Sequence, residues 1–431
     1  MTADGRRFDR SQEWLARARR VVPGASQTLT KGASMFVEGA YPVFLERGAG
    51  CRVWDVDGNE YVDYILGLAS ITLGYAYPAV TEAVTRQLQR GSIFSLPHPL
   101  EVEVAERLRD LIPCAEMARF VKTGSEADAA AVRVARAATG RDVIVYSGYM
   151  GWHEWYAITT PRSKGIPKDF ARLIVPFEYN DLGSLERVLD EHHGRVAAVF
   201  MEPVLLDAPA PGFLAAVRAA AHRHGALLIF DEIVSGFRWG VGGAQAHFGV
   251  VPDLATFGKG MANGLPLAAV VGRAEFMAQF DEIFVSSTFG GDTLALAACQ
   301  ATLDVYRSLP VIARLWEMGR RLQAGFSALA SGLGVPARMI GYSVHPKIVF
   351  DHPSPETQRL LMSLFLQESA ACGAIFHFAG FNVSYSHSEA DVDETLVACE
   401  GALQIVGEAL TDGRIAERLR GKPYAEAFRR S

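Results

Sequence analysis

A lysine near the middle of the chain, Lys259, has unusual surroundings for its type. It stands between two glycines in LATFGKGMANGLPLAAVV, residues 254–271, where no other residue is charged. The chain uses lysine sparingly, with seven lysines against thirty-five arginines. Because desolvation disfavours the ammonium form, Lys259 is either an awkward core residue or an amine kept ready for chemistry.

Two carboxylates follow apolar runs that are typical of buried strands. Glu202 comes directly after AAVFM, and Asp231 comes after ALLIF and is followed by Glu232. Open parallel sheets bind ligands beyond the carboxyl ends of their strands. A buried charge without a partner is costly, so we expect Asp231 to be paired with something.

Small polar residues and aromatic rings stand at two further strand ends. The run RFVK leads into Thr123-Gly124-Ser125 and then into the helical stretch EADAAAVRVARAA. Free N–H groups and the helix dipole make such a turn a natural phosphate cradle, although Ser125 taken alone could be only an N-cap. VIVYSG leads into YMGWHEWY, whose alternative interpretation is an aromatic core cluster; its candidate residues are Tyr149, Trp152 and His153.

Several other ligand classes are excluded by the residues that they require. LLIFDE resembles the acidic strand of P-loop ATPases, but Gly258-Lys259 is followed by glycine, and Asp253 replaces the first glycine of that loop. No G-x-G-x-x-G turn follows an early strand, as a dinucleotide dehydrogenase would need. Glu60 and Leu66 occupy positions where a calcium loop needs glycine and glutamate, so we predict no metal site.

Pyridoxal phosphate is a cofactor that needs all the remaining groups together. A lysine holds its aldehyde as a Schiff base, and a carboxylate keeps its pyridine nitrogen protonated. A turn binds its phosphate, and an aromatic ring stacks on the pyridine. Lys259, Asp231, Ser125 and Tyr149 supply one group each; the alternative for Lys259 is a snorkelling surface lysine.

The elements that would position these residues alternate between strand and helix. From about residue 100 to 275, apolar runs such as DVIVYSG alternate with helical stretches such as GFLAAVRAAAHRHG. This pattern favours an α/β fold with a mostly parallel central sheet flanked by helices. We expect residues 76–325 to form the large cofactor-binding domain, and residues 1–75 and 326–431 to form a smaller α/β domain.

The N-terminal region predicts a helix and then a hairpin. Asp9 and Gln12 have the spacing of a capping box, and CRVWDVDGNEYVDYI alternates around the turn Asp57-Gly58. The expected apolar face of the helix consists of Trp14, Leu15, Ala18, Val21 and Val22.

The composition of the chain limits its partners. It has 431 residues, a net charge of −6 and a pI near 6.0, so nothing electrostatic points to nucleic acid or an anionic membrane. No uninterrupted apolar run is long enough to span a membrane. Five scattered cysteines without a CxxC pair indicate reduced thiols and a cytoplasmic location.

Nearly the whole chain resembles the fold-type I, class III pyridoxal-phosphate aminotransferases of the glutamate-1-semialdehyde aminomutase-like group. The motifs that carry the resemblance are VPGASQTLTKG, VWDVDGNEYVDY, KTGSEADAAAVRVARAATGR, SGYMGWHEW, LLIFDEIVSGFR, PDLATFGKGMANGLP, STFGGDTLALAA and SYSHSEADVDETL. The resemblance implies that Lys259 forms the Schiff base and shuttles the proton, and that Asp231 pairs with the pyridine nitrogen. It also implies a set of further contacts: Gly124 and Ser125 at the phosphate, Tyr149 on the ring, Glu202 near the cofactor, and Thr288 at the phosphate of the neighbouring subunit. The role of Thr288 implies an obligate homodimer with shared sites.

Departures from the group's pattern concern the substrate. Met150 replaces the usual histidine after the stacking aromatic, Lys31 replaces an arginine that meets the substrate carboxylate, and Ala379 replaces a glutamate. The loss of that glutamate argues against glutamate-1-semialdehyde. Lys31, Trp152 and His153 are the expected substrate residues, and Arg238 and Arg338 are candidates for a substrate carboxylate.

The predicted activity is a ping-pong transamination between a small-molecule amino donor and a carbonyl acceptor. An intramolecular aminomutase or an epimerase on the same scaffold is the nearest alternative, and it would work without a second substrate. A cofactor-binding regulator or a structural dimer is the non-enzymatic alternative. The sequence does not name the donor or the acceptor.

Overall fold

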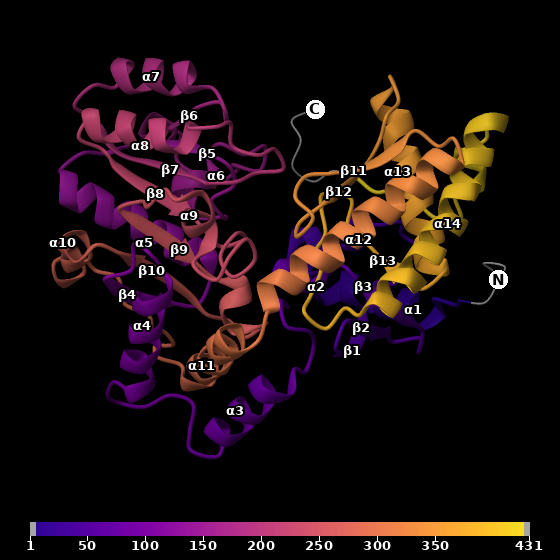
Figure 1. Cartoon of the computed structure of the whole chain (residues 1–431), viewed down its shortest axis with the longest axis horizontal. Coiled ribbons are helices and arrows are strands. Elements are labelled where there is room, and N and C mark those ends of the chain that lie inside the picture. Colours follow the sequence, from indigo (N-terminus) through magenta and orange to yellow (C-terminus); the bar gives the residue numbers. More distant parts are fainter. Residues whose placement is uncertain (1–5, 426–431) are drawn as a thin grey trace.

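A seven-stranded sheet forms the framework of the larger of two bodies (Figure 1). The computed structural model describes residues 6–425. The strand order is β4-β10-β9-β8-β7-β5-β6, and the pairs from β9 to β6 are parallel. The strands are β4 Met117–Val121, β5 Val143–Ser147, β6 Ile174–Pro176, β7 Val196–Met201, β8 Leu227–Asp231, β9 Leu254–Phe257 and β10 Ala268–Gly272. The α/β fold with a mostly parallel sheet is confirmed.

One strand, β10, runs antiparallel to both of its neighbours, β4 and β9. The loop of residues 258–267, which joins β9 to β10, contains only a short 3-10 turn, Lys259–Ala262. A parallel return would need a crossover of a dozen or more residues, usually a helix. The chain therefore turns back at the carboxyl end of β9, and this return loop carries Lys259.

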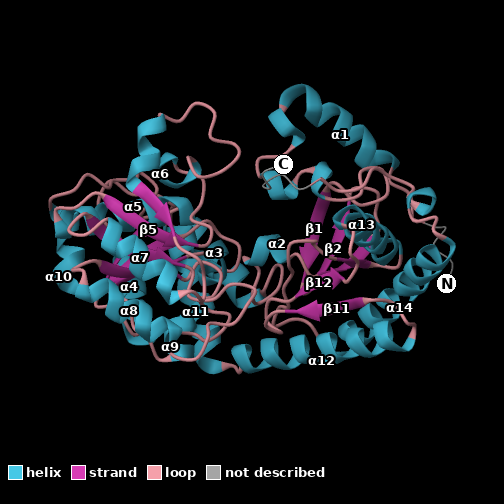
Figure 2. Ribbon diagram, turned by 90° about the horizontal axis from the view of Figure 1, so that it is seen from above, coloured by secondary structure: helices cyan, strands magenta, loops and turns pink. Residues whose placement is uncertain are grey.

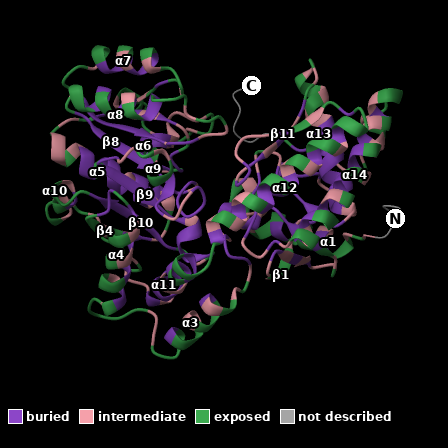
Figure 3. Ribbon diagram, in the orientation of Figure 1, coloured by how far each residue is buried: buried purple, intermediate pink, exposed green. Residues whose placement is uncertain are grey.

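Helices cover both faces of the sheet, whose strands are buried throughout their centre (Figure 3). On one face, Ile229 and Leu254 pack with the alanine-rich side of α5 (Gly124–Thr139). On the other, Phe230 and Ala255 join a core with α7 (Leu182–Glu191) and α8 (Phe213–Arg223). Successive strand side chains alternate between faces, so Asp231 and Thr256 belong to the α5 face.

Both ends of the described chain contribute to a second body beside the first (Figure 2). One sheet has the order β1-β2-β3-β13, and β11 pairs with β12. These strands are β1 Leu45–Ala49, β2 Arg52–Asp55, β3 Glu60–Asp63, β11 Ala337–Ile340, β12 Lys347–Phe350 and β13 Ala374–Ile375. We keep the domain boundaries at residues 75 and 325 as a proposal; the second falls within α12 (Val311–Gly332), which runs between the bodies.

The remaining helices surround these sheets. They are α1 Asp9–Val21, α2 Leu66–Ala69, α3 Pro78–Leu88, α4 Pro99–Leu111, α6 Glu154–Ala157, α9 Gly243–Phe248, α10 Ala274–Met277, α11 Thr293–Ser308, α13 Pro355–Ala371 and α14 Glu389–Asp412. Within residues 6–425, none of the helices has the length and apolar character needed to cross a membrane.

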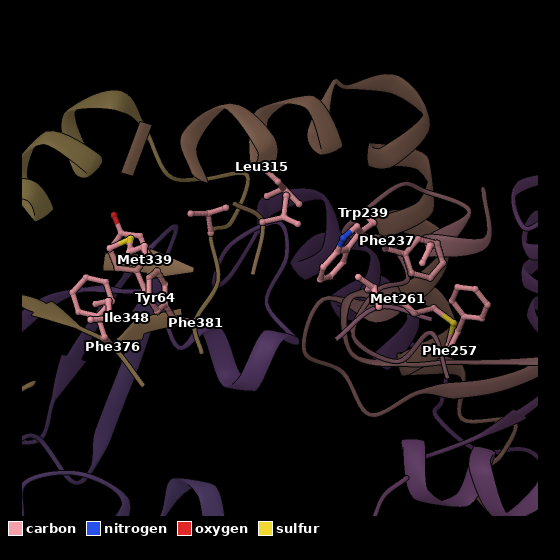
Figure 4. Packing of buried hydrophobic residues seen from close by; sticks show 14 of the residues in the cluster. Tyr64, Phe237, Trp239, Phe257, Met261, Leu315, Met339, Ile348, Phe376 and Phe381 are labelled. Atoms are coloured by element: carbon pink, nitrogen blue, oxygen red, sulfur yellow. The ribbon is translucent and has the colours of Figure 1, made fainter. Parts of the chain in front are cut away.

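A continuous apolar core joins the two bodies (Figure 4). Phe257 and Met261 flank the Lys259 turn on the side of the large sheet, and both are fully buried. Tyr64 and Phe376 stack at 5.0 Å on the other side. Because Met261 is anchored in this core, the turn that carries Lys259 is held firmly against the sheet.

The N-terminal hairpin is confirmed, but the expected cap of α1 is wrong. β2 pairs with β3 in antiparallel register around Asp57-Gly58. Asp9 makes no capping bond; instead, the N–H groups of Arg10 and Ser11 donate to Asp57 at 2.7 and 2.9 Å. A cap from the distant hairpin leaves no signal in the local sequence. The buried face is also narrower than expected, because Trp14 is 40% and Val21 79% exposed.

Candidate active site

A cavity of about 300 Å³ opens at the carboxyl ends of the parallel strands. Its walls come from the first turns of α5 and from the segments that follow β5, β7, β8 and β9. The structure therefore brings six of the predicted site residues together in one place: Gly124, Ser125, Tyr149, Glu202, Asp231 and Lys259.

Lys259 enters this cavity from a strained backbone conformation. Its φ of +42° lies in the left-handed region, which costs a residue with a side chain about 1–3 kcal/mol. The Tyr306 hydroxyl donates to the Gly260 carbonyl at 2.9 Å and supports this turn. Burial lowers the pKa of Lys259, and the nearby carboxylates Asp231 and Glu202 oppose that effect in part. The neutral, nucleophilic amine is therefore populated at lower pH than in free lysine.

The two adjacent carboxylates at the end of β8 differ in their partners. Glu232 is fully buried and accepts from the N–H groups of Ala244 and Gln245 at 2.7 and 2.8 Å. Asp231 accepts only from the Ile233 N–H, at 2.9 Å, and forms no ion pair within residues 6–425. Burial raises the pKa of Asp231 well above its ordinary value. Asp231 therefore lacks a cation in direct contact, which a buried carboxylate needs.

The N-terminus of α5 is capped by Thr123, so the interpretation of Ser125 as the N-cap is wrong. Thr123 Oγ1 accepts from the Glu126 N–H at 3.3 Å, and Glu126 accepts from the Thr123 N–H at 3.0 Å. The Ser125 hydroxyl instead lines the cavity and accepts from the Trp152 N–H at 3.2 Å. With the positive end of the helix dipole at this wall, the first turn of α5 favours an anion.

Glu202 fixes the loop that carries Tyr149. Its Oε1 accepts from the Tyr149 N–H at 2.7 Å, and burial raises the pKa of Glu202. The Tyr149 ring contacts Tyr156 edge-on, with centroids 5.7 Å apart, and it is 54% exposed. About half of the surface of Tyr149 is thus exposed next to the buried carboxylates.

Two further charged residues line the cavity, and sequence reasoning missed both. Asp128 lies on α5 one turn after Ser125, and its Oδ1 accepts from Thr256 Oγ1 at 2.8 Å. Lys122 pairs with Asp292 at 3.1 Å. The available signal for Asp128 was a second acid, two residues after Glu126, on the alanine-rich side of EADAAAVRVARAA.

Four other predicted residues lie outside the cavity lining in this chain. Trp152 is 70% exposed and packs edge-on against His153, with centroids 4.7 Å apart. Lys31 is exposed at the end of a 3-10 turn, Leu29–Lys31, and Thr288 lies on an exposed loop beside β4. A role for these residues in the substrate or cofactor site therefore remains a prediction.

Neither arginine considered for a substrate carboxylate lines the cavity. Arg238 is fully buried and donates to the carbonyls of Val344 and Val383 at 3.2 and 3.0 Å. Arg338 lies on the surface and pairs with Asp351 at 2.8 Å. Both guanidinium groups have structural partners that account for their positions.

Comparison with known proteins identifies the family. Residues 36–341 match the family model described as aminotransferase class-III. The chain belongs to the class-III aminotransferases.

Relatives of this class-III aminotransferase match it over almost its whole length. It is 36% identical to the 3-aminobutyryl-CoA aminotransferase of Cloacimonas acidaminovorans, over 95% of this chain and 100% of the relative. It is 35% identical to the glutamate-1-semialdehyde 2,1-aminomutase of Syntrophobacter fumaroxidans, over 93% of this chain and 98% of the relative. Among solved structures, the FumI protein of Sphingopyxis sp. MTA144 in its pyridoxal-phosphate form is similar to this chain with a TM-score of 0.89 and 28% sequence identity. The match covers 96% of this chain and 99% of the FumI chain.

The aminotransferase uses pyridoxal phosphate, and the residues of the cavity fit that cofactor. Asp231 is a buried carboxylate without a cation, as a protonated pyridine nitrogen requires. The first turn of α5 suits a phosphate, and Lys259 supplies an amine. Among the described residues, no group of three or more His, Cys, Asp or Glu side chains is arranged to hold a metal ion.

Proposed function

We propose that Lys259 holds the aldehyde of pyridoxal phosphate and moves the proton during amino transfer. The observation that carries this proposal is the position of Lys259 in one cavity with the unpaired carboxylate Asp231. The other cavity lysine, Lys122, is already paired with Asp292. When bound, pyridoxal phosphate supplies a carbonyl that takes up amino groups and a ring that accepts electrons.

Each surrounding residue then has one task. Asp231 holds a proton on the pyridine nitrogen, and Gly124 and Ser125 bind the phosphate at the N-terminus of α5. Tyr149 stacks on the ring, and Glu202 holds Tyr149 in place through its N–H. Lys259 Nζ, whose pKa burial lowers, accepts the proton from the substrate carbon and returns it to the cofactor side.

The visible absorption of the protein with pyridoxal phosphate tests these assignments. Addition of a suitable amino donor should bleach the absorption of the lysine-bound cofactor, and a keto acid should restore it. Lys259→Ala should bind the cofactor without the wild-type band and lose turnover by about 10⁴-fold. Turnover close to that of the wild type in this variant would exclude Lys259 from the reaction.

Transamination is favoured over an intramolecular mutase by Ala379. Its methyl side chain cannot replace the glutamate that the aminomutases of the group carry, and its N–H donates to His377 Nδ1 at 3.1 Å. We expect one amine substrate without an acceptor to react for a single equivalent and then stop. Continued turnover of one substrate alone would identify a mutase or an epimerase instead.

The surface at the β4 edge of the large sheet supports a homodimer with shared sites. β4 is an edge strand, and the exposed loop next to it carries Thr288 directly before Phe289 and four residues after Phe284. Phe284 is 84%, Phe289 58% and Met117 49% exposed, and a second copy of the chain would cover them. In that dimer, Thr288 would reach the phosphate in the partner's cavity.

Subunit mixing tests this arrangement. Lys259→Ala and Thr288→Ala subunits should each form defective homodimers, whereas a mixed dimer should contain one intact site. Recovery of activity on mixing supports the shared site, and a monomer in sedimentation experiments would contradict it. A cytoplasmic location agrees with the five free cysteines, and cell fractionation would check it.

A further inference from the structure

Asp128 is a buried acid whose surroundings differ from those of the other two carboxyls in the cavity. It is 1% exposed, and its only hydrogen bond within the described chain comes from the Thr256 hydroxyl at 2.8 Å. Asp231 and Glu202 each accept from a backbone N–H, at 2.9 and 2.7 Å. A backbone N–H can only donate and so favours a charged carboxylate.

Thr256 places Asp128 close to Asp231. In the parallel pair of β8 and β9, Thr256 is the register partner of Asp231, and both side chains lie on the α5 face of the sheet. Asp128 lies on α5 directly over that face and bonds to Thr256. Asp128, Thr256 and Asp231 thus lie together on the α5 side of the sheet, where Asp128 and Asp231 line the same cavity.

The charges around Asp128 do not balance if every carboxyl is ionised. The titratable groups that face it are Asp231, Glu202, Lys259 and Tyr149. Lys259 is the one amine of this set, and the other cavity lysine, Lys122, pairs with Asp292. Three buried carboxylates against one amine would repel each other strongly, so at least one carboxyl must carry a proton.

We propose that Asp128 is a positioning residue that carries a proton at neutral pH and thereby leaves Asp231 as the charged carboxylate for the pyridine nitrogen. This inference rests on the proposed function of Asp231. Of the three acids, Asp128 loses the least hydrogen bonding when it is protonated. The Thr256 hydroxyl can rotate and accept a hydrogen bond from the protonated acid, whereas a backbone N–H cannot accept one. Burial raises the pKa of Asp128 to about 8 and also raises the pKa values of Asp231 and Glu202, so the hydrogen-bond partners single out Asp128 among the three acids.

Infrared difference spectra of the holoenzyme between pH 6 and pH 10 test the proposal directly. A protonated carboxylic acid has a C=O stretch that a carboxylate lacks, and ¹³C-labelling of aspartate separates Asp from Glu. We expect an aspartic acid band at pH 7 that disappears with a midpoint near pH 8 and is absent in Asp128→Asn. Glu202→Gln is the matched control and should keep an aspartic acid band, with a lower midpoint because one neighbouring carboxylate is removed.

The outcomes separate this inference from the proposed function. The absence of an aspartic acid band at pH 7, or its survival in Asp128→Asn, would overturn the role of Asp128 while the visible band of the bound cofactor remained. The absence of that visible band in the wild type would instead overturn the proposed function.

A second variant keeps the test valid if Asp128→Asn does not fold. Thr256→Val preserves the volume of the side chain and removes the one hydrogen-bond donor that Asp128 has among residues 6–425. Both forms of Asp128 lose their hydrogen bond to Thr256, but a hydrogen bond to the charged carboxylate is roughly twice as strong as one to the neutral acid, so the midpoint of the band should rise by about one pH unit. An unchanged midpoint would overturn the assignment of the band to Asp128.

Discussion

A methyl group added at Gly151 should weaken cofactor binding by displacing Ser125. Gly151 has a φ of +82°, and a Cβ there would stand 2.8 Å from the Cβ of Ser125 and 3.0 Å from its Cα, while also overlapping the hydroxyl oxygen. Carbon atoms normally pack at about 3.5–4.0 Å, so Ser125 must move. The cost to folding stability is about 1–2 kcal/mol for the left-handed backbone and about 1–3 kcal/mol for overpacking.

The displaced hydroxyl of Ser125 would no longer reach the phosphate that we propose it binds. A hydrogen bond to a charged group contributes about 1.5–3 kcal/mol, which corresponds to roughly a 10- to 100-fold rise in the dissociation constant for pyridoxal phosphate. Titration of the apoenzyme with pyridoxal phosphate, followed by visible absorption, measures this change directly.

Gly212→Ala is the matched control for Gly151→Ala. Gly212 has a φ of +78°, and a Cβ there would have no atom within 4 Å. This variant should lose about 1–2 kcal/mol of stability from the backbone alone and keep the wild-type affinity for the cofactor. Wild-type affinity in Gly151→Ala would refute the phosphate role of Ser125, because the steric displacement would then have no effect on binding.

Two further predictions concern charge. Asp231→Asn should bind pyridoxal phosphate but lower turnover by about a hundredfold, because the pyridine nitrogen loses its charged partner; unchanged steady-state turnover would remove Asp231 from that role. Burial lowers the pKa of His377 and of His387 to about 4, whereas an unfolded imidazole titrates near 6.5. Between these values the unfolded chain binds more protons, so stability falls as the pH is lowered through that window. Urea unfolding at pH 7 and pH 5 should show this loss, and His387→Gln should reduce it by about 2 kcal/mol; equal losses in both proteins would contradict the shift.

The closeness of the site residues in space could be predicted because it follows from the topology of the sheet. Lys259, Asp231 and Glu202 all follow apolar runs, and the carboxyl ends of such strands meet at one edge of the sheet. The antiparallel direction of β10 was harder to foresee, since LAAVVGR is as apolar as its parallel neighbours. Only the shortness of the loop of residues 258–267 signals it.

Features that depend on contacts between distant segments could not be predicted. Asp57 caps α1 across the hairpin, and the local spacing of Asp9 and Gln12 suggested a cap that does not form. Asp128 was missed because its role depends on Thr256, which is 128 residues away along the chain. The choice between Thr123 and Ser125 as the cap of α5 depends on where the helical backbone angles begin, and the two candidates are two positions apart in a run of small residues.

Reductive trapping tests the central claim most directly. Borohydride treatment of the protein with pyridoxal phosphate fixes the cofactor on the lysine that holds it, and peptide mass spectrometry then locates the added mass. Lys259 and Lys122 are the two lysines of the cavity, and they fall in different regions of the chain. The account predicts the modification on Lys259 alone and its disappearance in Lys259→Ala. Modification of Lys122, or none at either residue, would contradict it.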